Sequence, residues 1–285
     1  MLKRPRYEEA RDLLLSLVCP GETERVPLEE GAGRVLAQEL YAAENVPAFD
    51  RSPYDGYALR AADVKDASRE APVTLRVLEE IPAGSAPTQP VTAGTASRVM
   101  TGAPIPDGAD TVIMFEKTEF TETSVTLFAP VRLGDNVIRA GEDIRAGTLL
   151  VSAGERIDAA LAGSLAAQGV TEPLVYKKPR IAVLSTGTEL VEADETPGAG
   201  KIRNSNAYTL IAAMRSLGCD TEYLGIVPDG TEGIAAAIAK GLSTCDAIVS
   251  TGGVSAGDYD LTPDAIESLD AEVLVRGLAM KPGMA

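Results

Sequence analysis

Two stretches of the sequence decide the fold, because each places a loop of small residues directly after a buried strand. Residues 181–190 have the sequence IAVLSTGTEL, and residues 247–260 have the sequence AIVSTGGVSAGDYD. In both, a short apolar segment ends at a Ser-Thr-Gly loop, which is typical of a buried strand in a parallel sheet. Backbone N–H groups in such loops can bind an anion, and the carboxylates that follow suit a metal ion. The two loops therefore predict a phosphate-ligand domain with acidic, metal-binding loops.

The last part of the chain, residues 178–285, alternates between strand-like and helix-like segments. Helix starts are expected near residues 205–206, at Thr231 and at Thr262, which Pro263 follows at the first helical position. This order predicts a doubly wound parallel sheet with helices on both faces and ligand loops at the carboxyl ends of the strands. The expected strands are 180–184, 222–227, 246–250 and 272–278, and the expected helices are 206–217, 231–240 and a segment from residue 262.

The rest of the chain has a different pattern, which predicts further domains. Residues 1–20 are assigned to an N-terminal helix, amphipathic over 5–18. Residues 46–145 are rich in β-type segments and turns, which favours an inserted β-rich domain or barrel over βαβ units. Residues 21–45 and 146–177, the latter with a helix over 158–168, are expected to form a discontinuous linking domain. The predicted fold class is therefore α/β plus β-rich, in several domains. The candidate strands of the β-rich part are 73–78, 97–101, 111–115 and 125–128.

Composition excludes several classes of function. The 285 residues include 26 basic and 42 acidic side chains, a formal net charge of −16, so neither nucleic acid nor an anionic membrane surface is an expected partner. There is no His, which excludes His-containing zinc sites and Ser-His-Asp triads. The cysteines, Cys19, Cys219 and Cys245, are spaced as buried thiols of a reducing compartment. The apolar run 13–18 is too short for a signal peptide or membrane span, so a cytoplasmic location is expected.

Each motif also has a purely structural interpretation. In the first loop, the hydroxyls and the N–H groups near Gly187 can hold a phosphate and Glu189 can reach a metal, but a tight turn with a surface Glu gives the same pattern. Asp258 and Asp260 can hold one cation, or they can form a turn and a cap before Thr262. Residues 52–58, 100–104 and 141–144 are compact loops that ordinary β-turn chemistry also explains.

Taken together and in order, these motifs resemble the MoeA family of molybdopterin molybdotransferases, which includes the E domain of gephyrin. The resemblance covers nearly the whole chain. One departure is Tyr54, which stands where the family usually has Met. Another is the end: after residues 281–283 the family shows another Lys and continues, whereas Met284 and Ala285 follow here. The matching segments are 52–58, 100–104, 141–144, 185–190, 252–255, 258–260 and 281–283.

The resemblance implies a fold, an assembly and a reaction. The doubly wound part should be similar to the molybdopterin-binding domain of MogA proteins. The chain should be elongated and form a homodimer, with each active site shared between the doubly wound domain of one subunit and the β-rich insertion of the other. Molybdate should be inserted into adenylylated molybdopterin with Mg²⁺ or another divalent cation, and AMP should be released. A MogA-like adenylyltransferase is a candidate partner.

The resemblance also assigns roles to residues. Asp55 and Asp143 match positions linked to activity and should position molybdate-bound water or the cation. Thr101 should donate a hydrogen bond to an oxyanion, and Lys281 should neutralise phosphate or molybdate charge. The pterin substrate should bind at Ser185, Thr186, Gly187, Gly252, Gly253, Val254 and Ser255. The expected metal ligands are Glu189, Asp229, Asp258 and Asp260.

Three hypotheses about function remain open from the sequence. The first is the molybdenum insertase. The second is a C-terminally truncated, non-catalytic fragment that dimerises or binds molybdopterin, because the rest of the doubly wound domain and a small C-terminal β domain are expected to be missing. The third is an unrelated phosphate-ligand transferase, which would explain the glycine loops but not Asp55, Thr101 and Asp143. Metal-dependent release of AMP separates the first two, and selectivity for the pterin excludes the third.

Overall fold

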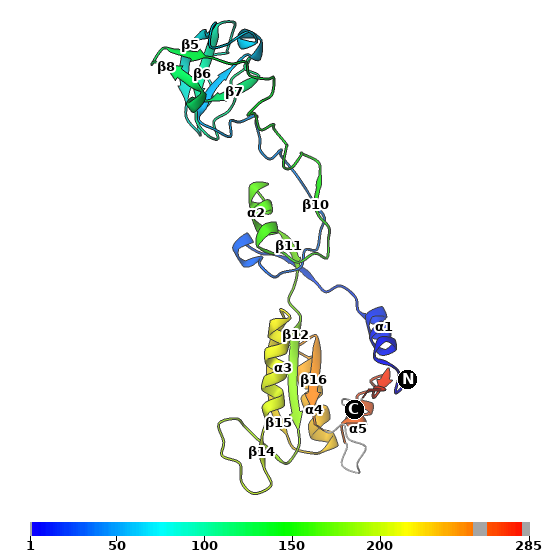
Figure 1. Ribbon diagram of the computed structural model, residues 1–285. Helices are drawn as coiled ribbons and strands as arrows, with labels where there is room; N and C mark the ends of the chain where they lie inside the picture. The colour runs from blue at the N-terminus through cyan, green and yellow to red at the C-terminus, as the bar shows by residue number, and fades with distance from the viewer. Residues whose placement is uncertain (1, 253–260, 281–285) are drawn as a thin grey trace. The chain divides into compact units, whose positions relative to one another are not determined.

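The computed structural model describes residues 2–252 and 261–280 (Figure 1). The chain divides into two compact units. Unit 1 comprises Met1–Ala37, Arg156–Ala159 and Glu172–Ala285, and unit 2 comprises Gln38–Glu155 and Ala160–Thr171. Unit 2 extends beyond the predicted β-rich domain 46–145 at both ends. The reason is that β3 (Leu40–Tyr41), before this domain, pairs with β10 (Leu149–Val151), after it.

Unit 2 is built around a six-stranded sheet in the order β7-β4-β6-β5-β9-β8. Neighbouring strands are antiparallel except β5 and β6, which are parallel. Successive residues of a strand face opposite sides of a sheet. Accordingly, Tyr57 and Leu59 lie in one apolar cluster and Ala58 in another. The strands are β4 (Gly56–Leu59), β5 (Val73–Ile81), β6 (Thr95–Val99), β7 (Thr111–Met114), β8 (Thr118–Phe120) and β9 (Ser124–Leu127).

Strand β4 is the most deeply buried strand of this sheet, and the sequence did not predict it. All four of its residues are buried, and it lies between β6 and β7. It directly follows Asp55, so the motif 52–58 leads into the sheet and is not a free loop. The other elements of unit 2 are α2 (Ala159–Ala167) and the short 3-10 helices Ala61–Val64 and Phe115–Lys117. The first residue of α2, Ala159, is still counted with unit 1.

Unit 1 contains the predicted doubly wound sheet. Strands β12 (Arg180–Thr186), β15 (Asp220–Val227) and β16 (Ala247–Thr251) are parallel, in the order β15-β12-β16. Helices α3 (Ser205–Ser216), α4 (Thr231–Leu242) and α5 (Thr262–Glu267) accompany them (Figure 1). Because β12 is the central strand, its residues Ala182, Val183 and Leu184 are completely buried, which explains the continuous apolar run in the sequence.

Helices cover both faces of this sheet, as predicted. A Cβ at Gly241 of α4 would meet the side chains of Ala182, Leu224 and Ile248, so α4 covers the face on which these residues lie. Ser185 and Tyr223 lie on the opposite face and contact Asn204, which begins α3. The right-handed crossovers of a βαβ unit produce this arrangement when the strand order reverses at a central strand.

Some details of the predicted sheet were wrong. The predicted fourth strand, 272–278, is reduced to β17 (Val275–Arg276), which pairs in parallel with β1 (Leu2–Lys3) outside the three-stranded sheet. Helices α4 and α5 begin at Thr231 and Thr262, as expected, and α3 begins at Ser205, one residue before its predicted range. Their N-caps are Gly230, Leu261 and, for α3, Asn204. Thr231 and Thr262 are therefore the first helical residues rather than caps.

Unit 1 also contains an antiparallel ladder and several short elements. Strand β2 (Thr23–Arg25) pairs with β11 (Leu174–Tyr176) in an antiparallel ladder. Nη2 of the buried Arg34 joins the two strands, because it donates to Glu24 at 2.5 Å and to the carbonyl of Tyr176 at 2.7 Å. Helix α1 (Tyr7–Leu17), the 3-10 helix Leu28–Glu30 and the parallel pair β13 (Leu190–Val191) and β14 (Ile202–Arg203) complete this part. In the described ranges, no helix has the length and apolar character needed to cross a membrane.

Candidate functional site

The two Ser-Thr-Gly loops meet at the carboxyl edge of the sheet in unit 1. Strands β12 and β16 are parallel neighbours, and their register places Ser185 opposite Thr251. Thr251 Oγ1 donates to Ser185 Oγ at 3.1 Å, and Thr186 Oγ1 donates to the Thr251 carbonyl at 3.5 Å. Ligands of open parallel sheets bind at this edge. The structure therefore brings together the described parts of both motifs, which lie more than sixty residues apart in the chain.

Gly252 is required by the close approach of the two loops. Its φ of +86° lies in the left-handed region, and a Cβ at this position would overlap the carbonyl oxygen of Thr186. Only glycine adopts this conformation readily and leaves room for the neighbouring backbone. The second loop can consequently pack directly against the end of β12.

A line of polar groups extends from these loops along the α3 face of the sheet. Ser185 Oγ donates to Asn204 Oδ1 at 3.3 Å, and Asn204 Nδ2 donates to the Tyr223 hydroxyl at 2.8 Å. Tyr223 donates in turn to the Glu192 carboxylate, at 3.0 and 3.2 Å. Burial, reinforced by the Glu192 carboxylate, raises the pKa of Tyr223 to about 12. Asn204, Tyr223 and Glu192 were not predicted as functional residues, because they come from three separate segments that only the fold brings together.

Two predicted metal ligands lie beside the first loop. Asp229 Oδ2 accepts a hydrogen bond from the Thr188 N–H at 3.0 Å. The Glu189 carboxylate lies close to the Cα of Gly187, since a Cβ there would be 2.6 Å from its Oε2. Lys201 also contacts this loop, because its Nζ donates to the Thr188 carbonyl. Both carboxylates are exposed. Over residues 2–252 and 261–280, no group of three His, Cys, Asp or Glu is arranged to hold a metal.

Six of the predicted site residues lie outside the described residues. They are Gly253, Val254, Ser255, Asp258, Asp260 and Lys281. Their assignments as pterin-binding, metal-binding and catalytic residues therefore remain predictions from the sequence.

In unit 2, the structure joins Asp55 to Thr101. Asp55 Oδ1 accepts hydrogen bonds from the backbone N–H of Thr101 at 2.7 Å and from its hydroxyl at 2.9 Å. These two bonds, in that order, hold the pKa of Asp55 below its usual range, with a further contribution from Arg98. The Thr101 hydroxyl was expected to donate to an oxyanion of the substrate. In the structure it donates to Asp55, because the two loops pack against each other.

The loop that carries Thr101 is held by the loop that carries Asp55. Gly102 N–H donates to the Ser52 carbonyl at 2.8 Å, and Ser52 N–H donates to the Ala103 carbonyl at 3.0 Å. Ser52 is buried, and its hydroxyl donates to the Tyr54 carbonyl at 2.5 Å. The segments 52–58 and 100–104, which resemble one family in the sequence, therefore form one structural unit.

Arg98 is a charged residue near this pair that the sequence did not single out. Its guanidinium carbon lies 4.7 Å from the centroid of the Phe115 ring, and its Nη1 donates to Glu80 at 3.1 Å. A cation over an aromatic face is stabilised by the ring's quadrupole. Arg98 is thereby held at the end of β6, where its charge favours the ionised form of Asp55.

Asp143 lines an open pocket of about 480 Å³ together with Glu142, Arg145, Leu161 and other residues of unit 2. It is exposed, and its backbone N–H donates to the Val46 carbonyl at 3.0 Å. Among the described residues, no hydrogen bond joins its side chain to Asp55 or Thr101. The structure thus places the predicted catalytic residues of unit 2 in two separate loops.

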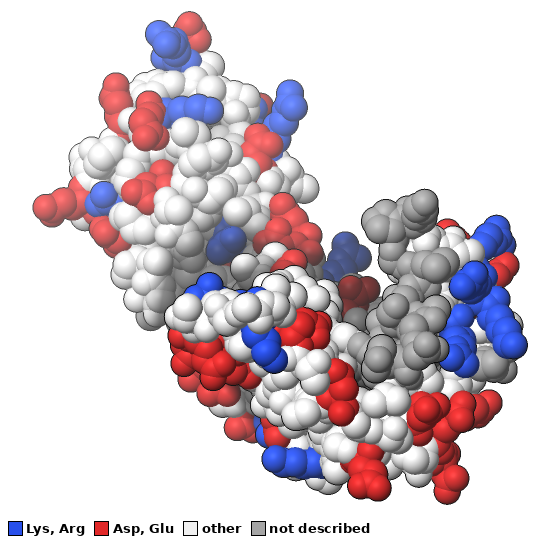
Figure 2. Space-filling model, turned by 90° about the horizontal axis from the view of Figure 1, so that it is seen from below, with Lys and Arg blue, Asp and Glu red and all other residues white. Residues whose placement is uncertain are grey.

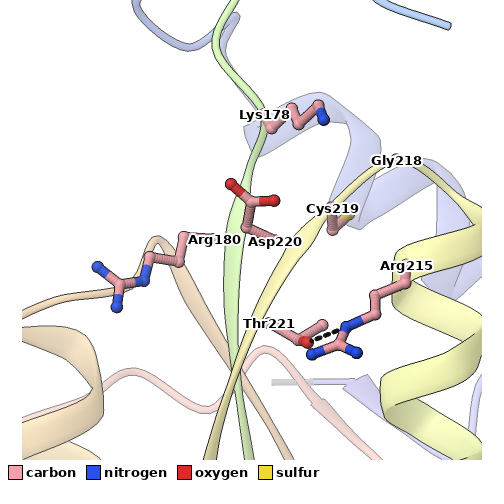
Figure 3. Close-up of a pocket in the computed structure, with 7 residues that line it drawn as sticks. All are labelled: Lys178, Arg180, Arg215, Gly218, Cys219, Asp220 and Thr221. Carbon is pink, nitrogen blue, oxygen red and sulfur yellow. Dashed lines mark hydrogen bonds between the residues drawn. The ribbon is translucent and has the colours of Figure 1, made fainter.

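A second pocket lies in unit 1 and is basic (Figure 3). It is at the amino edge of the sheet, opposite to the edge where the two Ser-Thr-Gly loops meet. It has a volume of about 620 Å³, and its lining includes Lys178, Arg180, Arg215 and Asp220. Arg180 and Asp220 begin β12 and β15, so this pocket adjoins the amino ends of the strands. In Figure 3, Arg215 turns toward Thr221, to which its Nε donates at 2.9 Å. None of the described site candidates lines this pocket, and ligands of parallel sheets bind at the other edge.

Comparison with known proteins agrees with the resemblance that the motifs indicated. Residues 6–169 match the family model described as the MoeA N-terminal region (domain I and II), and residues 182–285 match a probable molybdopterin binding domain. A molybdopterin molybdenumtransferase of Bacillus subtilis (strain 168) is 41% identical over 92% of this chain and 62% of its own length. One from Nostoc sp. (strain PCC 7120) is 36% identical over 98% of this chain and 65% of its own.

Solved structures give the same result. Two crystal structures of molybdopterin biosynthesis MoeA proteins from Pyrococcus horikoshii match with TM-scores of 0.86 and 0.81, at 36% and 34% identity. The first match covers 99% of this chain and 70% of the solved chain, and the second covers 87% of this chain and 66% of the solved chain. The chain spans a little under two thirds of the length of the curated relatives it matches.

Proposed function

The chain belongs to the MoeA family, and on this premise we propose that it acts in molybdenum cofactor biosynthesis as a molybdopterin molybdotransferase. In the proposed reaction, molybdate is inserted into the dithiolene of adenylylated molybdopterin and AMP is released. The observation that carries the proposal is the meeting of the two Ser-Thr-Gly loops at the carboxyl edge of the sheet, with carboxylates directly beside them.

The strand-end loops are proposed to bind the pyrophosphate of the substrate. Gly187 and Gly252 belong to the loops at the edge where the strands end, and backbone N–H groups of such loops can stabilise an anion. The protein as a whole carries a formal charge of −16, and acidic side chains are spread over much of the face shown in Figure 2. Local dipoles and a cation are therefore needed to bind an anionic substrate.

The residues present fit a divalent cation such as Mg²⁺, which prefers oxygen ligands. Glu189 and Asp229 lie beside the same loop, and Asp229 uses only one carboxylate oxygen for the Thr188 N–H. Asp258 and Asp260 are proposed as further ligands from the sequence. When bound, the cation would neutralise charge on the phosphoanhydride that is cleaved. The part played by the protein is to hold these carboxylates at the loop that binds the phosphates.

In unit 2, Asp55 is proposed to act as a fixed hydrogen-bond acceptor. The bonds from Thr101 lower the pKa of Asp55 and fix one of its oxygens. A bare carboxylate would repel molybdate, so Asp55 is proposed to orient a water bound to molybdate or to the cation. Asp143 is proposed for the same task, and Lys281 for neutralising anionic charge. We also propose a homodimer, and a MogA-like adenylyltransferase as the supplier of the adenylylated substrate.

The proposal is tested by calorimetric titration of adenylylated molybdopterin into the purified chain with Mg²⁺, followed by measurement of AMP after molybdate is added. Tight binding and release of AMP are the expected results. Binding without release would favour the non-catalytic fragment. The absence of binding by a folded sample would refute the function proposed here.

Asp229→Asn tests the proposed metal ligand. We expect it to weaken Mg²⁺ binding and AMP release at least tenfold, because one anionic oxygen ligand is lost. Asp220→Asn is the matched control, since it removes the same charge at the other end of β15. Equal effects of the two substitutions would show that only the overall charge matters and would contradict the assignment.

A further inference from the structure

The polar groups behind the strand-end loops have a direction of hydrogen bonding that is fixed at one residue, Asn204. As the N-cap of α3, Asn204 accepts a hydrogen bond from the Ala207 N–H through Oδ1, at 3.3 Å. An amide nitrogen has no lone pair for this contact, so the N–H decides which end of the side chain is oxygen. The other end, Nδ2, must then face the Tyr223 hydroxyl, 2.8 Å away.

Beyond Asn204 on the inner side, the direction continues to Glu192. The Tyr223 oxygen accepts from Asn204 Nδ2, so its own proton is donated to the Glu192 carboxylate at 3.0 and 3.2 Å. An ionised carboxylate can only accept hydrogen bonds. The inner end is thus closed by a full negative charge, and a charge-assisted bond of this kind is stronger than one between neutral groups.

On the outer side, the same direction leads to the ligand edge. Asn204 Oδ1 also accepts the proton of Ser185, at 3.3 Å. A serine has one proton, so the Ser185 oxygen is left as an acceptor, and Thr251 Oγ1 donates to it at 3.1 Å. Ser185 and Asn204 are 0% and 1% exposed, which leaves no room for solvent to compete. The single proton of Thr251 therefore points into the protein.

We infer that Thr251 Oγ1 presents lone pairs, and not a proton, to a bound ligand, so that this point of the site meets a hydrogen-bond donor. The inference rests on the proposed function, because it assumes that a ligand binds at this edge. The phosphoanhydride oxygens of an adenylylated substrate are fully ionised at neutral pH, so they can only accept hydrogen bonds and are unsuited to this point. The donor is either a water bound to the divalent cation or an N–H of the pterin.

The inference divides the hydroxyls of the two loops into two kinds. Ser185 and Thr251 select a donor, whereas binding of the pyrophosphate falls to backbone N–H groups and to hydroxyls outside the chain of bonds. Thr186 is not one of these, since it is 1% exposed and its Oγ1 lies against Gly252. The expectation that the Ser185 hydroxyl holds a phosphate is replaced by a positioning role.

Ser185→Ala separates the two assignments by the sign of its effect on binding of inorganic pyrophosphate. Without its acceptor, Thr251 can turn its proton outward, so pyrophosphate should bind about three- to tenfold more tightly, the gain expected from one added donor. If Ser185 itself donated to the phosphate, the substitution would weaken binding. Weaker or unchanged binding overturns the inference. Ser216→Ala, at the far end of α3, is the control and should change nothing.

Thr251→Val tests the donor directly and distinguishes its two sources. It should weaken binding of Mg²⁺ alone by about three- to tenfold if the donor is a bound water, and binding of molybdopterin in EDTA by the same factor if the donor is a pterin N–H. Thr251→Ser keeps the acceptor and should restore the affinity. If Thr251→Val weakens neither probe, the inference is wrong.

Neutron diffraction from deuterated crystals gives a readout that does not depend on binding. Deuterium on Thr251 Oγ1 that points to Ser185 supports the inference, and deuterium that points to the open edge overturns it. If the unaltered chain binds none of the three probes, the proposed function fails, and the neutron map still decides the direction of the hydrogen bonds.

Discussion

Asp55 receives both of its hydrogen bonds from one residue, the N–H and the hydroxyl of Thr101. Its pKa is lowered, so the bonds stabilise the folded state above the ordinary carboxyl pKa, and this contribution is lost as the pH falls through the lowered value. The side chain is exposed to solvent, which screens the effect. The pair therefore matters more for the position of a charged acceptor than for stability.

Thr101→Val should raise the pKa of Asp55 toward the usual carboxyl range, because the substitution removes the hydroxyl bond and leaves the backbone bond. NMR titration of the side-chain carboxyl carbon measures the change. Thr101→Ser keeps the hydroxyl and should leave the pKa near that of the unaltered chain. A pKa that is the same in the Val variant would show that the backbone N–H alone holds the charge.

The single residues of the site that could be predicted lie within a motif, apart from Asp229, which was assigned as an oxygen ligand of the cation. Asp55, Thr101, Glu189 and Asp229 were all assigned from the sequence, and the structure places Asp229 and Glu189 at one loop and Asp55 beside Thr101. The chain of bonds through Asn204, Tyr223 and Glu192 could not be predicted, since hydrogen-bond partners on different elements depend on register and packing. Its one signal was the run of cap-forming residues at 204–206.

At the scale of elements, the turn after β16 determines how closely the two loops approach. Gly252→Ala should lower the free energy of unfolding by about 2–3 kcal/mol, because the new Cβ meets the Thr186 carbonyl in a left-handed conformation. Denaturant titration measures the loss. Gly233→Ala, in α4 of the same unit, is the control: its Cβ would have only an ordinary contact of 3.7 Å, and a helical Ala should be neutral or stabilising. Equal losses would contradict the assigned role of Gly252.

Elements with strong periodic or apolar patterns were predicted correctly, and elements defined by partners were not. The strands 180–184, 222–227 and 246–250 correspond to β12, β15 and β16, because buried parallel strands have continuous apolar sequences. Strand β4 was missed, since four residues that include Gly56 and Tyr57 have little strand signal of their own. The sequence placed residues 272–278 in the doubly wound sheet, whereas β17 pairs with β1. That pairing could not be predicted, because it depends on residues more than 270 positions away.

At the scale of the whole molecule, the chain consists of two units with separate cores. Calorimetry should therefore show two unfolding transitions. Leu184→Ala should shift only one, and Leu127→Ala only the other, because each residue is fully buried in a different unit. Each substitution should cost about 2–5 kcal/mol. Leu217→Ala is the control, as this side chain is 62% exposed and should have little effect. Shifts of both transitions by one substitution would mean that the units unfold together.

The pairing of β2 with β11 has a consequence for the order in which the protein is made. On the ribosome, Thr23–Arg25 emerges long before its partner Leu174–Tyr176 has been translated. All of unit 2 is synthesised between them, and its ladder of β3 with β10 can close first. That closure shortens the loop that β2 and β11 must later bridge, and the entropy lost in bridging it falls accordingly. Translation thus gives unit 2 the first opportunity to fold, and a delay there would leave an early strand without its neighbour.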